Sequence, residues 1–226
     1  TLIVVFFGIA LWISKAGKRA EFISLYGFTQ GTTYRITYES EKGAIYQAAI
    51  DSVLSRVDNS LSIYQPGSVI SKFNRNVPGT VADELFTEVF NKSLEVYNTT
   101  GGAFDITVGP IVNALGFGSS DTMEVDSMLI NRLHRLVGMD KVRLGNGQLF
   151  KSDSNIVLDV NAIAQGYTVD LVAGLLQQKG IKNYMVEIGG EVRAQGKNQS
   201  NRIWQIGIDK PQEGNNMPGA DLQTII

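Results

Sequence analysis

The chain has 226 residues, of which 43% are hydrophobic and 19% charged, so it is long enough for a sizeable core and has an ordinary globular composition. Its formal net charge is −2 and it has no long basic run, which argues against a dedicated nucleic-acid-binding protein. The sequence has no cysteine, which excludes disulfides and zinc–thiolate sites. The one histidine, His134, is expected on an amphipathic helix in a surface or half-buried position, so histidine-based catalysis is disfavoured.

The first segment, residues 2–13, is an unbroken apolar run, and small and basic residues follow it at 14–19. A membrane-spanning helix needs about 20 residues, and the core of a signal peptide about 7–15. We expect residues 1–20 to form a hydrophobic helix that acts as a signal-anchor, because no Ala-x-Ala-like cleavage site follows the run. A cleaved signal peptide and a buried N-terminal element are the alternatives.

Residues 21–226 are expected to form one α+β domain, because helices and strands do not alternate regularly. Apolar residues recur every four positions from Ile45 to Leu61, which predicts an amphipathic helix. Asp83 is the expected N-cap of a second helix, which has Leu94 on its apolar side and ends at Gly101.

The other expected elements follow from hydrophobic periodicity and turn residues. In chain order they are a strand at 27–38, a loop-rich stretch at 62–74, a helix at 126–136, a hairpin at 142–151, a helix at 161–180, strands at 184–188, 192–194 and 203–208, a loop at 211–219 and a strand at 221–226. The last strand ends without a turn or a polar tail, so we interpret the chain as a piece of a longer protein.

Two short segments combine acidic residues with glycines: GGAFDITVGP at 101–110 and LDVNAIAQGYTVD at 158–170. Backbone can approach a ligand closely at such places, because glycine has no side chain and adopts positive φ. Asp159 precedes an expected helix, whose N-terminal N–H groups suit a diphosphate. Structural interpretations stay open for both carboxylates, with Asp159 as a helix cap and Asp105 as an Asx-turn residue. A tight turn explains Gly189 and Gly190 without a ligand.

In this order and spacing, the two segments resemble the ApbE family, the FAD:protein FMN transferases. The resemblance covers about residues 27–226. Further matches are QGT at 30–32, where the family has Met-Gly-Thr, LSIYQPGSVISKFN at 61–74 and YMVEIGGEVRAQG at 184–196. The resemblance implies an ApbE-like mixed α/β domain with an antiparallel sheet and packed helices.

The resemblance, carried over residue by residue, also implies a flavin site. The residues placed around FAD are Gln30, Tyr64, Ala103, Phe104, Asp105, Asp159 and Gln165. Tyr64 would stack on the isoalloxazine ring or line its pocket. Ala162 matches a position whose oxygen binds Mg²⁺, and the metal would bridge the FAD phosphates. The sequence departs from the family at Gln30, where the family has Met, and at Gln165, where it commonly has Lys or Glu. No residue is assigned as the catalytic base.

The function implied by the resemblance is an Mg²⁺-dependent enzyme that transfers the FMN moiety of FAD to a Thr or Ser hydroxyl of an acceptor protein and releases AMP. The implied acceptors are subunits of Na⁺-translocating NADH:quinone reductase and Rnf-type complexes. The implied location is the bacterial inner membrane, with the domain facing the periplasm or the cell exterior. An FAD diphosphatase and a non-catalytic FAD-binding or trafficking protein stay open. The family's other metal ligands lie beyond residue 226, so we expect residues 1–226 alone to be inactive.

Overall fold

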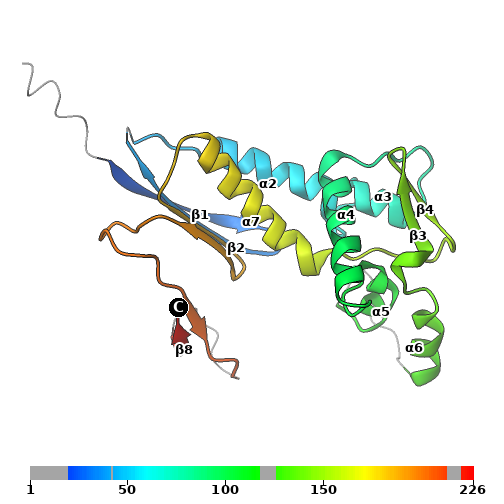
Figure 1. Cartoon of the computed structure of the whole chain (residues 1–226). Helices are drawn as coiled ribbons and strands as arrows, with labels where there is room; N and C mark the ends of the chain where they lie inside the picture. Colours follow the sequence, from blue (N-terminus) through cyan, green and yellow to red (C-terminus); the bar gives the residue numbers. More distant parts are fainter. Residues whose placement is uncertain (1–19, 42, 118–125, 213–219) are drawn as a thin grey trace, which may run out of the picture.

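The computed structural model describes residues 20–41, 43–117, 126–212 and 220–226 (Figure 1). The predicted hydrophobic membrane helix lies outside the described residues, apart from residue 20, and stays a prediction. Within the ranges just given, no helix combines the length and the apolar character that crossing a membrane requires.

A four-stranded antiparallel sheet with the order β1-β2-β5-β6 forms the first part of the fold. Its strands are β1 (Glu21–Thr29), β2 (Thr32–Ser40), β5 (Tyr184–Ile188) and β6 (Glu191–Gln195). Two-residue turns join β1 to β2 and β5 to β6. Tyr34 pairs with Ile188, so both turns lie at the same end of the sheet.

Two long helices, α2 (Gln47–Leu61) and α7 (Asn161–Gln178), pack on one face of this sheet (Figure 1). Their buried residues recur at helical spacing, as Ile50 and Leu54 show on α2. The core between the helices and the sheet contains Tyr34, Ile36, Tyr38, Ile50, Leu54, Val169, Val172, Ala173, Leu176, Ile181, Tyr184, Val186 and Ile188.

A second lobe lies beside the sheet and has its own core (Figure 1, right). Its elements are α3 (Val69–Asn74), α4 (Glu84–Thr99), η1 (Ile106–Val108), α5 (Gly109–Ala114), α6 (Ser127–His134), η2 (Met139–Lys141), β3 (Val142–Gly145) and β4 (Gln148–Lys151). Ile156, Leu158 and Val160 are buried in this core, and the chain then enters α7. This segment therefore connects the second lobe to the helix that covers the sheet.

Most of the expected elements are confirmed, including the α+β class with an antiparallel sheet. Asp83 caps α4, since its side chain accepts a hydrogen bond of 2.8 Å from the N–H of Phe86. The hairpin of β3 and β4, the extent of α7 and the strand β5 also agree with the predictions. His134 is exposed at the last residue of α6, as expected for a surface histidine.

Several boundaries were wrong. The single strand expected at 27–38 is the junction of two strands, because Gln30 and Gly31 form a turn. The expected strand at 203–208 is reduced to β7 (Gly207–Asp209), which pairs with β8 (Leu222–Ile225), while Ile203 makes one isolated bridge. Ile45 precedes α2 and Leu94 is exposed on α4, so neither belongs to the core.

Short helices account for the other differences. The stretch expected to be loop-rich contains α3, whose first turn is capped by Ser68 through a 3.1 Å bond from the N–H of Ser71. The glycine-rich segment at 101–110 continues into η1 and α5, where Pro110 stands in the first turn. Proline there fits a helix start, because its missing N–H has no intrahelical partner in any case.

Candidate functional site

Two glycine-containing turns form the end of the sheet near which three of the predicted flavin residues, Gln30, Tyr64 and Gln165, lie. Gln30 and Gly31 have φ values of 50° and 76°, and Gly189 and Gly190 have 57° and 93°. Positive φ at both central residues is characteristic of a type I′ hairpin turn, and a non-glycine residue there is under strain. The N–H of Gly189 donates to the carbonyl of Thr33 at 3.1 Å, which joins the second turn to β2.

Helix α7 contacts both turns through side chains from its first half. Gln30 Nε2 donates a hydrogen bond of 2.7 Å to Thr168 Oγ1. A Cβ atom on Gly189 would lie 2.7 Å from Gln165 Nε2 and 2.7 Å from Thr32 Cγ2, so glycine is needed for this close packing. The predicted residues Gln30 and Gln165 are therefore brought together, 135 positions apart in the sequence.

A cavity of about 190 Å³ opens between this end of the sheet, α2 and α7. Its lining residues are Gln30, Val57, Asp58, Leu61, Ser62, Tyr64, Asn161, Ala164 and Gln165. Three of the predicted flavin residues, Gln30, Tyr64 and Gln165, thus share one cavity. We refer to it as the Tyr64 cavity.

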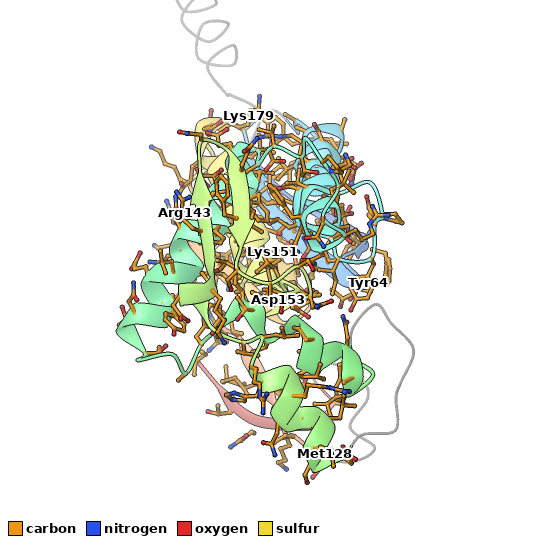
Figure 2. All side chains as sticks on the ribbon, turned by 90° about the vertical axis from the view of Figure 1, so that its right-hand side faces the viewer. Tyr64, Met128, Arg143, Lys151, Asp153 and Lys179 are labelled. Carbon is orange, nitrogen blue, oxygen red and sulfur yellow. The ribbon has the colours of Figure 1, made fainter. Side chains whose placement is uncertain are left out.

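Tyr64 lies at the rim of this cavity, and its side chain is 61% exposed (Figure 2). Its loop is nevertheless fixed, because the carbonyl of Ser62 accepts hydrogen bonds from Ser68 Oγ at 2.7 Å and Ser71 Oγ at 3.1 Å. Tyr64 also borders a second hollow of about 360 Å³, which Asn74 and Asn113 help to line. An aromatic ring held between two hollows can stack on a planar ligand.

Asp159 lies where the second lobe meets α7. Asn74 holds the preceding residue, with Nδ2 donating to the Leu158 carbonyl at 2.9 Å and Oδ1 accepting from the Leu158 N–H at 2.8 Å. Asp159 Oδ1 accepts from the N–H of Asn161 at 2.8 Å, but the N-cap of α7 is Val160, so Asp159 bonds to the first residue of the helix without being its N-cap as predicted. Asp159 is 8% exposed, and this burial raises its pKa, while the bond from Asn161 partly offsets the rise.

A backbone hydrogen bond joins the segment that contains Asp105 to the segment that contains Asp159, since the N–H of Asp159 donates to the carbonyl of Ile106 at 2.7 Å. Asp105 Oδ1 accepts from the N–H of Thr107 at 2.8 Å and from Thr107 Oγ1 at 2.6 Å, which is the Asx turn that the sequence suggested. A Cβ on Gly109 would lie 2.5 Å from the carbonyl oxygen of Val157. The glycine therefore permits the two acidic segments to pack directly against each other.

The other predicted site residues are less central. Ala103 is exposed, and Phe104 is half-buried against the core of the second lobe. Neither lines the Tyr64 cavity. Asn161 lines the cavity and also bonds to Asp159, so it links the predicted carboxylate to Gln30 and Tyr64.

Sequence reasoning missed Asp58, which lines the same cavity from the last turn of α2. Its carboxylate has no hydrogen-bond partner in the described part of the chain, and burial raises its pKa. The negative end of the helix dipole disfavours a carboxylate there, and no basic residue of the last turn compensates it. The available signal was an acidic residue one helical turn before the LSIY motif.

The described residues do not complete a magnesium site. They include no group of three or more His, Asp or Glu side chains placed to hold a metal ion. Ala162 is exposed in the first turn of α7 and would offer one neutral carbonyl oxygen. Mg²⁺ prefers about six oxygen ligands, so ligands beyond these residues would be required.

Comparison with known proteins matches this chain to one family and to named flavin transferases. Residues 30–226 match the model of the ApbE family. The FAD:protein FMN transferase of Vibrio cholerae is 37% identical over 211 residues, which cover 89% of this chain and 63% of the relative. The protein of the same name from Haemophilus influenzae is 37% identical over 218 residues, covering 89% of this chain and 62% of the relative. The chain thus spans less than two thirds of the length of these relatives.

Solved structures agree with the sequence comparison. The flavin transferase ApbE from Vibrio cholerae superposes with a TM-score of 0.80 at 35% identity, covering 85% of this chain and 65% of that one. The apo form of the Pseudomonas stutzeri flavinyl transferase ApbE gives a TM-score of 0.77 at 29% identity, covering 84% of this chain and 63% of that one. Both the family match and the shared fold lead to one conclusion: the chain belongs to the ApbE family.

Proposed function

We propose that the full-length protein transfers the FMN moiety of FAD to a Thr or Ser hydroxyl of an acceptor protein and releases AMP. The names of the relatives support flavin transfer, and the hydroxyl acceptor and AMP release are our proposal. The observation that carries it is the Tyr64 cavity, where Gln30, Tyr64 and Gln165 meet the N-terminus of α7 next to Asp159.

The residues of this chain would bind and orient the nucleotide. Tyr64 would stack on a planar ring at the rim of the cavity, and Gln165 would hydrogen-bond to polar groups of the ligand. The N-terminus of α7 would favour the diphosphate through its partial positive charge. Asp105 Oδ1 accepts both of the bonds from Thr107, which leaves Oδ2 for a ligand donor.

The proposed reaction replaces one phosphorus–oxygen bond with another. The acceptor hydroxyl oxygen forms a bond to the phosphorus of the FMN half, the bridging bond of the diphosphate breaks, AMP leaves and the hydroxyl proton is released. Holding the hydroxyl and the phosphorus in line is the main contribution a protein can make to such a step.

Magnesium dependence is included in the proposal on the strength of the family resemblance. Because the described residues offer a single neutral oxygen at Ala162, no step above is assigned to the metal. When bound, Mg²⁺ would neutralise charge on the phosphates.

The acceptors and the location are also proposals. We infer that acceptor subunits of Na⁺-translocating NADH:quinone reductase or Rnf-type complexes are modified outside the cytoplasm, with the apolar run at residues 2–13 directing the protein to the bacterial inner membrane. Alkaline carbonate extraction and protease accessibility in cells that express the natural gene test this location. Recovery in the soluble cytoplasmic fraction would contradict it.

Product analysis tests the activity. Full-length protein is incubated with FAD, Mg²⁺ and an acceptor that contains a suitable Thr, and the products are separated and identified. We expect flavin-labelled acceptor and AMP in equal amounts. Free FMN plus AMP would instead indicate an FAD diphosphatase, and intact FAD would indicate a non-catalytic binding protein.

A further inference from the structure

Gln30 has a side chain whose orientation is fixed by its neighbours. Its Nε2 donates to Thr168 Oγ1 at 2.7 Å, and Thr168 Oγ1 donates to the carbonyl of Ala164 at 2.7 Å. A hydroxyl has one proton, so the Thr168 oxygen that donates to Ala164 has only acceptor capacity left for Gln30. The amide nitrogen of Gln30 must therefore face Thr168, which leaves Oε1 directed elsewhere.

The oxygen Gln30 Oε1 is buried and has no hydrogen-bond partner. Within the described ranges, every other fully buried side-chain nitrogen or oxygen has one. An unpaired buried acceptor is destabilising, and Gln30 also adopts a strained backbone conformation with φ of 50°. The unpaired acceptor and the strained backbone therefore occur in one residue, and this residue lines the Tyr64 cavity.

Asp58 supplies a second unpaired acceptor to the same cavity. It lines the cavity from α2, is half-buried and has no hydrogen-bond partner among the described residues. Two unpaired acceptors, one of them a carboxylate, disfavour a phosphate and favour a group that donates hydrogen bonds. The polar part of the cavity is thus suited to an N–H group on a ring edge, with Tyr64 available to stack on the ring.

We propose that Gln30 Oε1 accepts a hydrogen bond from an N–H on the ring edge of the nucleotide in the Tyr64 cavity, and so helps to select that ring. The inference rests on the proposed function, in which the nucleotide is FAD. FAD has such an N–H at two places, the imide of the isoalloxazine ring and the amino group of adenine. The thioether of Met, the residue that the family resemblance places at this position, is only a weak acceptor, so Gln30→Met removes this contact.

Titration of full-length protein with the two halves of FAD tests the inference. The wild type, Gln30→Met and Thr168→Val are each titrated with FMN and with AMP. Gln30→Met removes the acceptor and the bond to Thr168, whereas Thr168→Val removes the same bond and retains the acceptor. Thermal unfolding of all three proteins reports the structural effect of the lost bond separately.

We expect Gln30→Met to weaken the binding of one half about tenfold or more, while Thr168→Val changes it by less than about threefold. A loss confined to FMN assigns the imide N–H, and a loss confined to AMP assigns the adenine amino group. In the first case, methylation of the flavin N3 should weaken binding to the wild type but not to Gln30→Met.

Unchanged affinity of Gln30→Met for both halves would overturn the inference, and so would an equal loss in Thr168→Val, which would indicate a structural role. These results leave the proposed function intact if the wild type binds FAD. Failure of the wild type to bind FAD would overturn the proposed function and this inference with it.

Discussion

Several residues of the site have charged or unpaired polar groups in buried surroundings, which lowers the stability of the fold. Such residues are candidates for a functional role. Asp159 and Asp58 are carboxylates in surroundings that disfavour their charge, and Gln30 has an unpaired buried oxygen. The sequence predicted Asp159 through its motif and Gln30 through the family resemblance. It could not predict the unpaired oxygen, which depends on Thr168, a residue 138 positions away.

The first residue-scale prediction concerns Asp159. Its pKa is raised by burial, so its contribution to stability is present below the unfolded pKa and is lost as the pH rises through the folded pKa. We expect Asp159→Asn to unfold at an equal or higher temperature than the wild type at pH 7, with a smaller difference in acid. The same variant should bind FAD about tenfold more weakly or worse.

Asp153→Asn is the matched control for this variant. Asp153 Oδ1 accepts from the N–H of Asn155 at 2.8 Å, as Asp159 does from Asn161, but Asp153 is exposed. The control should leave FAD affinity unchanged and should lower stability by less than about 1 kcal/mol, because it removes only the attraction between the exposed Asp153 carboxylate and Lys151. Wild-type FAD affinity in Asp159→Asn would refute the placement of Asp159 in the flavin site, and a large loss of thermal stability at pH 7 would refute the account of its buried charge.

At the scale of elements, the sequence predicted the long helices well and the short ones poorly. α4 has many apolar positions at helical spacing, which fixes both the type and the extent of the helix, whereas α7 is apolar around most of its circumference and was predicted from its length and from Gly180 at its end. α3 and α5 have six residues each, too few for a periodic signal, and only Ser68 and Pro110 marked their starts. The turn at Gln30 was missed because glutamine rarely adopts positive φ.

The contact between α5 and the segment before Asp159 yields the second prediction. In Gly109→Ala, the new Cβ would meet the backbone carbonyl of Val157 at 2.5 Å, and a backbone atom cannot be moved by a rotamer change. We expect a loss of about 1–3 kcal/mol in the free energy of unfolding, typical of overpacking, together with weaker FAD binding. Chemical denaturation measures the first effect.

Gly174→Ala in α7 is the control, because we expect it to raise the free energy of unfolding and not to lower it. No atom lies within 4 Å of the position of its Cβ, and alanine is the better helix former. The substitution should stabilise the protein by about 0.5–1 kcal/mol. Equal effects of the two substitutions would show that Gly109 is not needed for close packing.

Lys151 connects the β4 hairpin to α3 and gives the third prediction. Its Nζ donates to the carbonyls of Phe73 and Ile156 at 3.0 Å each, and burial lowers its pKa. Lys151→Met leaves these carbonyls without the ammonium, so we expect a loss of about 1.5–3 kcal/mol in the free energy of unfolding.

Lys92→Met provides the comparison, because Lys92 forms an exposed ion pair with Glu95. Its loss should cost less than about 1 kcal/mol. If both lysine variants unfold at the same denaturant concentration, the bonds of Lys151 do not hold the second lobe together.

For the whole molecule, the arrangement of two cores explains where the site lies. The segment from Ile156 to Val160 is buried in the second lobe and continues into α7, which covers the sheet. Asp159 is therefore fixed by one core, while Gln30 belongs to the sheet that forms the other. The family resemblance predicted that both residues lie around one ligand, but the patterns of the sequence alone did not, because pairing between distant segments leaves no periodic signal.

The central claim is that the Tyr64 cavity binds a flavin nucleotide, and titration of full-length protein with FAD, followed by flavin fluorescence, tests it most directly. Tyr64→Leu is compared with Tyr26→Leu, since Tyr64 is 61% exposed and Tyr26, on β1, is 63% exposed. Loss of one stacked aromatic ring should weaken FAD binding about tenfold in Tyr64→Leu, and Tyr26→Leu should match the wild type. Wild-type affinity in Tyr64→Leu, or an equal loss in Tyr26→Leu, would contradict the claim.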